Sequence, residues 1–309
     1  MTPPVPTPGP PAPPQPVIRA REVTMAYGGR PVLHGIDLDI HRGEVFALLG
    51  PNGAGKTTTV EILEGFRRRS AGEVHVLGTD PERADDAWRG RIGLVLQSWR
   101  DHGRWRVGEL LAHFATYYPD PRDPAAVLAL VGLTGQAGQR VDRLSGGQRR
   151  RLDVALAIVG RPELLFLDEP TTGFDPQARH AFHDLVGRLA RDDGVTVLLT
   201  THDLVEAERL ADRIAMLVGG RIRACGTPSE LARLAAARAE VRWTAEDGTP
   251  HREQTEDASR LVWELHRAAP GPIAGLEVRR PTLEDTYLRM VHEEHDATDG
   301  ALDGEAQPR

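Results

Sequence analysis

Cysteine, lysine and long apolar runs are nearly absent from this 309-residue chain, and each absence narrows its class. The single cysteine, Cys225, excludes an internal disulfide and a cysteine-based metal cluster, and it is compatible with a reducing cytoplasm. No apolar stretch reaches 18 residues, so we expect no membrane-spanning helix. The first 16 residues lack the positive and then apolar order of a signal peptide, so none is expected.

Excess charge of one sign is also missing from most of the chain. The formal charge is −7, but residues 293–309 carry six acidic side chains against one arginine, which leaves the remainder near −2. A protein that neutralises many phosphates needs an excess of basic side chains. We therefore expect no non-specific binding of nucleic acid.

Only one of the 38 basic residues is a lysine, Lys56. The arginine bias is most simply the mark of a GC-rich genome, and one lysine could remain by chance. The functional interpretation is that Lys56 stands where a compact ammonium is needed and a planar guanidinium would not serve. Its sequence neighbours decide between these two interpretations.

Three short apolar runs predict the core, at residues 44–50, 164–168 and 195–202. None alternates apolar with polar residues, so they favour parallel strands that are covered on both faces. Helical patterns separate the runs, which indicates an α/β sheet. Ligands of such sheets bind at the carboxyl ends of the strands, where these runs end in Gly50, Asp168 and His202.

The flanking segments predict further units. Nine of the first 16 residues are proline, so residues 1–16 are expected to be a mobile tail, with an SH3-type ligand as the alternative. We predict a main domain at 17–228 that contains a helical insertion at about 98–160. A small α+β domain at 229–292 and a disordered acidic tail at 293–309 are expected to follow.

Within these units the pattern predicts individual elements. The insertion should contain three helices, at 107–118, 124–132 and 147–160. The small domain should begin at a capping box formed by Thr227 and Glu230, with proline at the first helical position. Its remaining elements should be strands at 240–244 and 276–280, a helix at 258–268 and a last helix from Leu283.

The first apolar run leads into a glycine-rich segment that fits the phosphate-binding pattern G-x-x-x-x-G-K-[ST]. Its glycines let backbone N–H groups turn toward phosphate oxygens, and the following helix adds favourable potential. Lys56 would reach the β- and γ-phosphates, and the Thr57 hydroxyl would ligate Mg²⁺. The candidate phosphate-binding residues are Gly50, Pro51, Asn52, Gly53, Ala54, Gly55, Lys56, Thr57 and Thr58.

Two acids end the second apolar run. Asp168 at the end of a buried strand is placed to hold Mg²⁺, usually through water, and Glu169 can take a proton from an attacking water. An Asp-Glu pair alone is common at strand ends. Its position after four apolar residues and downstream of a phosphate loop favours the catalytic interpretation.

Residues 144–148 read Leu-Ser-Gly-Gly-Gln at the start of a predicted helix. Here the chain resembles the nucleotide-binding subunits of ABC transporters, whose signature this segment matches. The resemblance implies a P-loop NTPase core, and it implies that Ser145 and Gly147 form a second anion site that completes the ATP site of another copy. ATP and Mg²⁺ would then lie between two chains paired head to tail as a homodimer.

The resemblance implies further roles, residue by residue. Tyr27 resembles the aromatic that stacks on adenine, and it would otherwise simply pack. Gln97 resembles the glutamine that senses Mg²⁺ and water and links the core to the helical insertion. His202 resembles the switch histidine that contacts the γ-phosphate, and Asp175 resembles a residue that contacts the partner subunit. The other 11 histidines are expected to lie at the surface.

The motifs at 144–152, 168–173 and 281–288 resemble those of ATPases paired with ABC-2-type permeases, including drug exporters of the daunorubicin-resistance type. Phe174 and the stretch 99–107 depart from that pattern, and the stretch lies where the family meets its permease. The resemblance therefore implies an ATP-hydrolysing subunit that powers export from the cytoplasmic face of the membrane. The alternatives are a permease-free ABC ATPase with a regulatory, ribosomal or DNA role, and an importer.

Overall fold

The computed structural model describes residues 16–95, 102–236, 239–245, 247–268, 271–280 and 282–303, with the side chains of 236 and 295–303 excepted. The core is a six-stranded sheet in the order β5-β6-β7-β3-β8-β9, in which only β9 is antiparallel to its neighbour. The three predicted apolar runs form its centre, so the predicted α/β fold is confirmed. The strands of this sheet are β3 (Val45–Leu49), β5 (Ile92–Val95), β6 (Leu164–Asp168), β7 (Thr196–Thr201), β8 (Arg213–Val218) and β9 (Arg221–Gly226).

Alternate residues of β3 show why its sequence does not alternate in polarity. Val45, Ala47 and Leu49 pack into a core shared with the helices, whereas Phe46 and Leu48 pack into a second core on the other face. Both faces of the strand are therefore buried, and both need apolar side chains.

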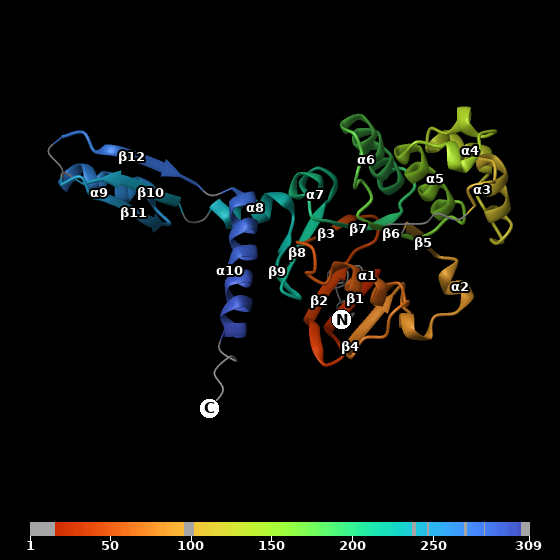
Figure 1. The fold of residues 1–309 in the computed structure, drawn as a ribbon, viewed down its shortest axis with the longest axis horizontal. Coiled ribbons are helices and arrows are strands. Elements are labelled where there is room, and N and C mark those ends of the chain that lie inside the picture. The colour runs from red at the N-terminus through yellow and green to blue at the C-terminus, as the bar shows by residue number, and fades with distance from the viewer. Residues whose placement is uncertain are drawn as a thin grey trace, which may run out of the picture.

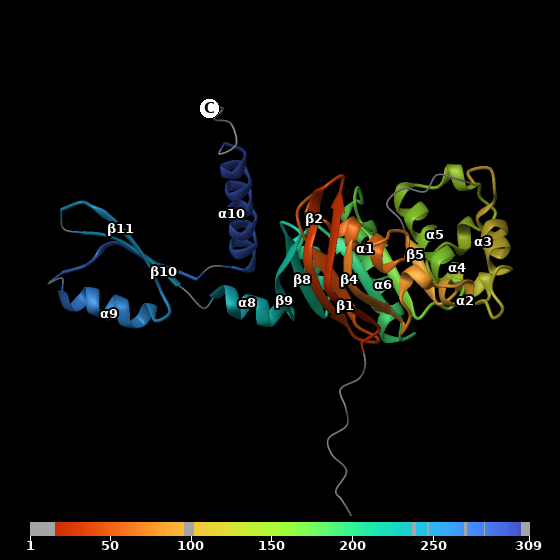
Figure 2. The same cartoon turned by 90° about the horizontal axis from the view of Figure 1, so that it is seen from below.

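A second, antiparallel sheet in the order β2-β1-β4 covers one face of the central sheet, and helices cover the other face (Figure 2). This arrangement is made by β1 (Ile18–Tyr27), β2 (Arg30–Ile40), β4 (Ala71–Val76), α1 (Lys56–Leu63), a 3-10 turn (Pro81–Arg83), α2 (Asp86–Arg89), α6 (Pro176–Arg191) and α7 (Leu204–Leu210).

The predicted helical insertion is present as α3 (Val107–Ala115), α4 (Pro124–Leu130) and α5 (Gly146–Ile158). Each helix is slightly shorter than predicted at its C-terminal end. The segments between α4 and α5 include two 3-10 turns, at Thr134–Gln136 and Val141–Arg143. In both views these helices lie at one end of the molecule (Figures 1 and 2).

The small sheet at the opposite end has the order β11-β10-β12 and one covering helix, α9. The predicted capping box before α8 is present, because the Glu230 N–H donates to Thr227 Oγ1 (3.2 Å) and the Thr227 N–H donates to Glu230 Oε2 (2.8 Å). The elements of this region are α8 (Pro228–Ala236), β10 (Ala239–Thr244), β11 (Pro250–Thr255), α9 (Ala258–Ala268), β12 (Ala274–Arg279) and α10 (Leu283–Asp303).

Three predictions for this region were wrong. Strand β11 was not predicted, because its polar sequence begins with proline and covers no core on its own. Helix α10 continues to Asp303, so residues 293–303 are not the predicted disordered tail, and Glu294 pairs with Arg223 of β9 (2.5 Å). Leu283 and Tyr287 join the main core, so this helix is not confined to the small domain, although Asp285 pairs with Arg279 of β12 (2.9 Å).

Among the residues that the structure describes, none of the helices combines the length and apolarity needed to cross a bilayer.

Candidate active site

The glycine-rich loop joins β3 to α1, as predicted. A side chain at Gly50 would bring its Cβ to 2.3 Å from the Leu217 carbonyl oxygen, so only glycine fits there. Gly55 caps α1 with φ +101°, a left-handed conformation that glycine adopts without strain, and an added Cβ would lie 2.6 Å from Leu33 Cδ2. Close packing therefore fixes the path of the loop.

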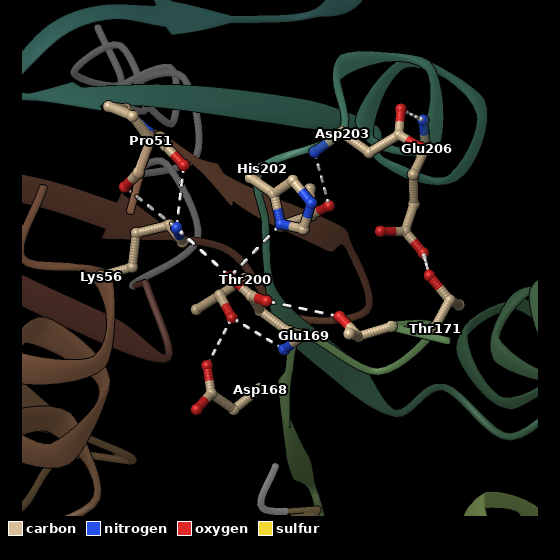
Figure 3. Close-up of polar contacts among 12 residues, drawn as sticks. Pro51, Lys56, Asp168, Glu169, Thr171, Thr200, His202, Asp203 and Glu206 are labelled. Atoms are coloured by element: carbon tan, nitrogen blue, oxygen red, sulfur yellow. Dashed lines mark hydrogen bonds and ion pairs between the residues drawn. The ribbon is translucent and has the colours of Figure 1, made fainter. Parts of the chain in front are cut away.

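Lys56 is the first residue of α1 and is 6% exposed. Its Nζ donates to the carbonyl oxygens of Gly50 (2.8 Å) and Pro51 (3.2 Å) and lies 3.4 Å from Glu169 Oε1 (Figure 3). A compact ammonium with three donors can make these contacts at once. A planar guanidinium would be too large for the same space, which agrees with a required lysine.

Strand order brings the other predicted residues to this loop. Strand β7 lies between β3 and β6, and the three are parallel, so their carboxyl ends meet at one edge. Asp168 is opposite Thr200 in the sheet register, and the Thr200 hydroxyl donates to Asp168 Oδ1 (2.6 Å). The Glu169 N–H donates to the same hydroxyl oxygen (2.9 Å). Thr200 therefore holds both acidic residues in place.

Thr200 was missed by the sequence reasoning. The signal that could have found it is a threonine near the carboxyl end of a fully buried strand, two residues before His202. Buried polar groups normally have a hydrogen-bond partner. A threonine in this position therefore predicts a polar neighbour on the adjacent strand.

The Glu169 carboxylate is the centre of the cluster (Figure 3). Its Oε1 lies 3.4 Å from Lys56 Nζ and 3.5 Å from His202 Nδ1, and its Oε2 accepts from the Thr172 hydroxyl (3.3 Å). Glu169 has φ +42°, a strained conformation for a residue with a side chain, and such strain gathers at functional sites. The structure thus brings Lys56, Glu169 and His202 together.

A second buried network holds the segment after Glu169. Thr171 Oγ1 donates to Glu206 Oε1 (2.5 Å), and His183 Nε2 lies 3.3 Å from the same oxygen. Burial raises the pKa of Glu206, but the hydrogen bonds from His183 and Thr171 outweigh it, so the pKa is lowered overall. His183 is 6% exposed, so the prediction that every histidine other than His202 lies at the surface was wrong.

Ser145 caps α5 in a capping box: its hydroxyl oxygen accepts from the Gln148 N–H (3.2 Å), and Gln148 Oε1 accepts from the Ser145 N–H (3.0 Å). Ser145 is exposed. A cavity of about 800 Å³ lies beside this helix start, and its lining includes Leu144, Gly146 and Glu169 but no residue of 50–58. The start of the signature helix and Glu169 therefore share one cavity, and the phosphate loop contributes no residue to its lining.

Arg150 connects the signature helix to the acidic strand end. Its Nη2 donates to the Asp168 carbonyl oxygen (2.6 Å) and its Nε to the Pro170 carbonyl oxygen (3.1 Å). Burial lowers the pKa of Arg150, and the charges of Asp153 and Asp168 oppose that shift. The sequence reasoning gave Arg150 no role beyond membership of the motif.

Tyr27, the predicted adenine platform, lies beside the phosphate loop, and its stacking on adenine stays a prediction. Tyr27 ends β1 and is 39% exposed, and its hydroxyl lies 3.3 Å from Thr58 Oγ1. The Arg67 guanidinium lies over its ring at 4.9 Å and pairs with Glu61 (2.6 Å). The Arg67 guanidinium therefore occupies one face of the ring.

The remaining predicted site residues that the structure describes lie outside the cluster around Glu169. Gln97 lies outside the described residues. Asp175 caps α6 by accepting from the Ala178 N–H (2.8 Å), and its predicted contact with a partner subunit stays a prediction. Gly147 lies in the first turn of α5. The remaining loop residues follow β3 in the predicted order, with Ala54 buried, Pro51 and Thr58 half-buried, and Asn52, Gly53 and Thr57 exposed.

Among the described residues, no group of three or more His, Cys, Asp or Glu side chains could hold a metal by itself. Thr57 and Asp168 supply oxygen donors, the type that Mg²⁺ prefers, and Mg²⁺ usually completes its shell with water and phosphate oxygens. These residues therefore fit a metal that arrives with a phosphate ligand. Together, the loop, the acidic strand end and the sheet order define a P-loop nucleotide-hydrolysing protein.

Comparison with known proteins identifies the family. The family model described as "ABC transporter" matches residues 33–172. The "Nod factor export ATP-binding protein I" of Cupriavidus pinatubonensis is 38% identical over 300 residues, which cover 90% of this chain and 91% of that protein. A "Fluoroquinolones export ATP-binding protein" of Mycobacterium tuberculosis is 39% identical over 229 residues, covering 73% of this chain and 75% of that protein.

A solved dimeric bacterial ABC transporter cassette has a TM-score of 0.61 and 26% identity, and the match covers 68% of this chain and 98% of that one. The chain therefore belongs to the ABC transporter ATP-binding family and is an ATP-binding and ATP-hydrolysing subunit. The predicted family and enzyme class are confirmed.

Proposed function

We propose that this chain powers export through a separate membrane permease and that two copies, paired head to tail, enclose the ATP. The observation that carries this proposal is that the start of the signature helix borders a cavity that the phosphate loop of the same chain does not line. Glu169 lies within 3.5 Å of both Lys56 and His202, and it also borders that cavity, which is lined by Leu144 and Gly146 but by no residue of 50–58. In this proposal the signature of one chain therefore meets the phosphate loop of the other copy.

In this proposal the phosphates of ATP lie along the loop at 50–57, and Lys56 turns from the Gly50 and Pro51 carbonyls toward the β- and γ-phosphates. Glu169 accepts a proton from the attacking water while the Thr172 and Thr200 contacts hold its position. His202 lies beside Glu169 and donates to the γ-phosphoryl group. These positioned charges stabilise the transition state without a covalent intermediate.

Mg²⁺ would be held by Thr57, Asp168 and Gln97, and when bound it would neutralise charge on the β- and γ-phosphates. The hydrogen bond from the Thr200 hydroxyl to Asp168 Oδ1 would fix the orientation of this carboxylate for that role. The Thr57 hydroxyl is exposed at the start of α1 and is accessible to a ligand of the loop.

Ser145 would complete the ATP site of the second copy through its hydroxyl and the first N–H groups of α5. The capping box uses the oxygen of Ser145 as an acceptor and leaves its O–H as a donor to a phosphate oxygen. Hydrolysis would then remove the bridging phosphate and loosen the two chains.

Export is supported by the relatives whose names describe export ATP-binding proteins. Because those names refer to the ATP-binding component, we propose a separate permease as partner, and the ABC-2 type is the one that the C-terminal motif at 281–288 favours. The chain would then lie on the cytoplasmic face of the membrane, bound through that permease. We propose no nucleic-acid partner.

Glu169→Gln tests the proposed mechanism. The variant removes the proton acceptor but keeps size and hydrogen bonding, so ATP binding should remain while turnover falls by about 10²- to 10⁴-fold. The exposed Glu208 of α7 offers a matched control as Glu208→Gln. Near-native turnover in Glu169→Gln, with the control also active, would show that another group is the base.

A further inference from the structure

A cavity of about 380 Å³ lies between the small sheet and helix α10, at the left of Figure 1, and no residue of the phosphate loop lines it. Basic side chains dominate its described lining, in contrast to the apolar cores of the molecule. Such a gathering of like charges is unfavourable unless something compensates it. The basic residues of the lining are Arg242, Arg252, Arg279, Arg289 and His292.

The register of the small sheet brings three of these arginines to one face. Arg242 of β10 lies opposite Arg252 of β11, and Glu240 of β10 lies opposite Arg279 of β12. Side chains alternate between the two faces of a strand, and Val241, between Glu240 and Arg242, packs with α9. The charged residues therefore occupy the other face, toward the cavity. The polar strand β11 thus contributes to this cavity rather than to an apolar core.

Glu240 holds two of the arginines in place. Its side chain is 10% exposed and forms ion pairs with both Arg242 and Arg252. Burial raises the pKa of Glu240, but the hydrogen bonds from Arg242 and Arg252 outweigh it, so the pKa is lowered overall. Glu240 therefore stays charged, but its single carboxylate compensates only one of the two guanidinium groups.

Helix α10 adds to this positive charge. Asp285 pairs with Arg279 (2.9 Å), whereas Arg289, one turn later, has no ion pair or hydrogen bond with a residue that the structure describes. With Glu293 as the third acid of the lining, four arginines face three acids, and a protonated His292 would raise the excess to two positive charges. Guanidinium groups match the oxygens of phosphate, and arginines that approach from three strands and a helix suit a tetrahedral anion.

We propose that this cavity binds a small phosphorylated anion, with Arg289 as a principal contact. A phosphate group carries up to two negative charges near neutral pH, which matches the excess of the lining. The sheet arginines, already oriented by Glu240 and Asp285, would contact the anion from one side and Arg289 from the other. The volume of the cavity is in the range of protein pockets for small ligands and admits a phosphate monoester.

Bound phosphate would also connect the small domain to the nucleotide-binding unit. The face of α10 opposite the cavity carries Leu283 and Tyr287, which are buried in the main core, and Glu294, which pairs with Arg223 of β9. An anion that joins Arg289 to the sheet arginines would therefore hold the small sheet against a helix that is fixed in the nucleotide-binding unit. This inference requires neither ATP hydrolysis nor a permease, so it goes beyond the proposed function.

The test is a titration with inorganic phosphate at constant ionic strength, followed by differential scanning fluorimetry and by hydrogen exchange of α10. The full-length chain carries Lys56→Ala in every arm, because the phosphate loop would otherwise bind the same probe. We expect saturable stabilisation by phosphate and slower exchange of the α10 amides. Arg289→Gln should weaken the apparent Kd at least about tenfold, because it removes a charge-assisted contact, and Arg252→Gln should weaken it as well. Arg233→Gln, at an exposed arginine of α8, is the matched control and should bind as its parent does.

Without phosphate, Arg289→Gln should melt no lower than its parent, because it removes a charge that lacks a described partner; lost binding is then not lost folding. Vesicles of phosphatidylcholine with and without phosphatidic acid distinguish the sources of the phosphate group. Co-sedimentation that requires both phosphatidic acid and Arg289 assigns the group to a lipid headgroup, whereas phosphate binding without co-sedimentation assigns it to a soluble anion. Succinate binding as tight as phosphate binding, no saturable binding of phosphate, or equal binding by Arg289→Gln and its parent would overturn the proposal.

Discussion

Replacing Glu64 by glutamine should stabilise the protein at alkaline pH. Glu64, at the C-terminal end of α1, is buried without a partner among the described residues, and burial raises its pKa from the ordinary 4.5 to about 8. Between these two values the folded chain keeps a proton that the unfolded chain has lost. The native state therefore binds more protons, and its free energy of unfolding falls as the pH rises through this window.

The size of the effect follows from the shift. Each pKa unit corresponds to about 1.4 kcal/mol, so the loss approaches about 5 kcal/mol above pH 8 and vanishes below about pH 4.5. Glutamine carries no proton to lose and can fill the same volume. The gain of Glu64→Gln over the native chain should thus be near zero at pH 4.5 and a few kcal/mol, by order of magnitude, at pH 8.5.

Urea unfolding across pH 5 to 8.5 measures this difference in the free energy of unfolding. Nucleotide and Mg²⁺ are left out, because a cation bound at Asp168 would change the charge near Glu64. Asp153→Asn should behave in the same direction over a lower window, up to about pH 6. Glu208→Gln serves as the exposed control and should run parallel to the native chain. If the Glu64→Gln and native curves also stay parallel, Glu64 is not a buried unpaired acid and the reasoning fails.

Three further predictions concern the site and the core. Thr200→Val should lower ATP turnover and cost about 1–3 kcal/mol, because Asp168 and the Glu169 N–H lose their shared partner, whereas Thr200→Ser should retain both activity and stability. Arg150→Lys should lower ATP turnover more than ATP affinity, because the substitution removes the hydrogen bonds that join the signature helix to the strand end. Nucleotide titration measures the affinity, and equal losses of turnover and affinity would contradict this prediction. Phe182→Ala should cost about 3–5 kcal/mol of unfolding free energy, against almost none for the exposed Phe66→Ala, and equal costs would show that the assigned core is wrong.

The central sheet and its motifs were predictable because their signals are local. Continuous apolar runs ending at Gly50 and Asp168 define buried strands, and the strand-loop-helix context identifies the phosphate loop. The helices of the insertion were also predicted from their local sequence, and in the structure Ser145 and Asp123 cap two of them.

Contacts between distant segments could not be predicted in this way. Thr200 meets Asp168, and Arg150 meets the Pro170 carbonyl, only after the strands and α5 have packed. His183 looked like a surface residue because its partner Glu206 lies on another helix. Pairing across elements, rather than local pattern, determines these positions.

The C-terminal region failed for a related reason. Strand β11 is polar on both faces and is held by its pairing with β10, so no apolar pattern marks it. The acidic composition after Glu293 indicated disorder, but α10 is anchored through Leu283 and Tyr287 in the main core, and it carries that segment forward as helix. The composition of the segment gives no sign that the preceding residues are anchored in the main core.

A mixing experiment tests the claim that each copy holds half of two active sites. Lys56→Ala removes the phosphate-loop half and Ser145→Arg blocks the signature half, so each variant alone should hydrolyse ATP very slowly. In an equal mixture half of the dimers are hybrids with one intact site, so activity should return to about a quarter of the native level. A mixture that is no more active than its components would contradict the shared site.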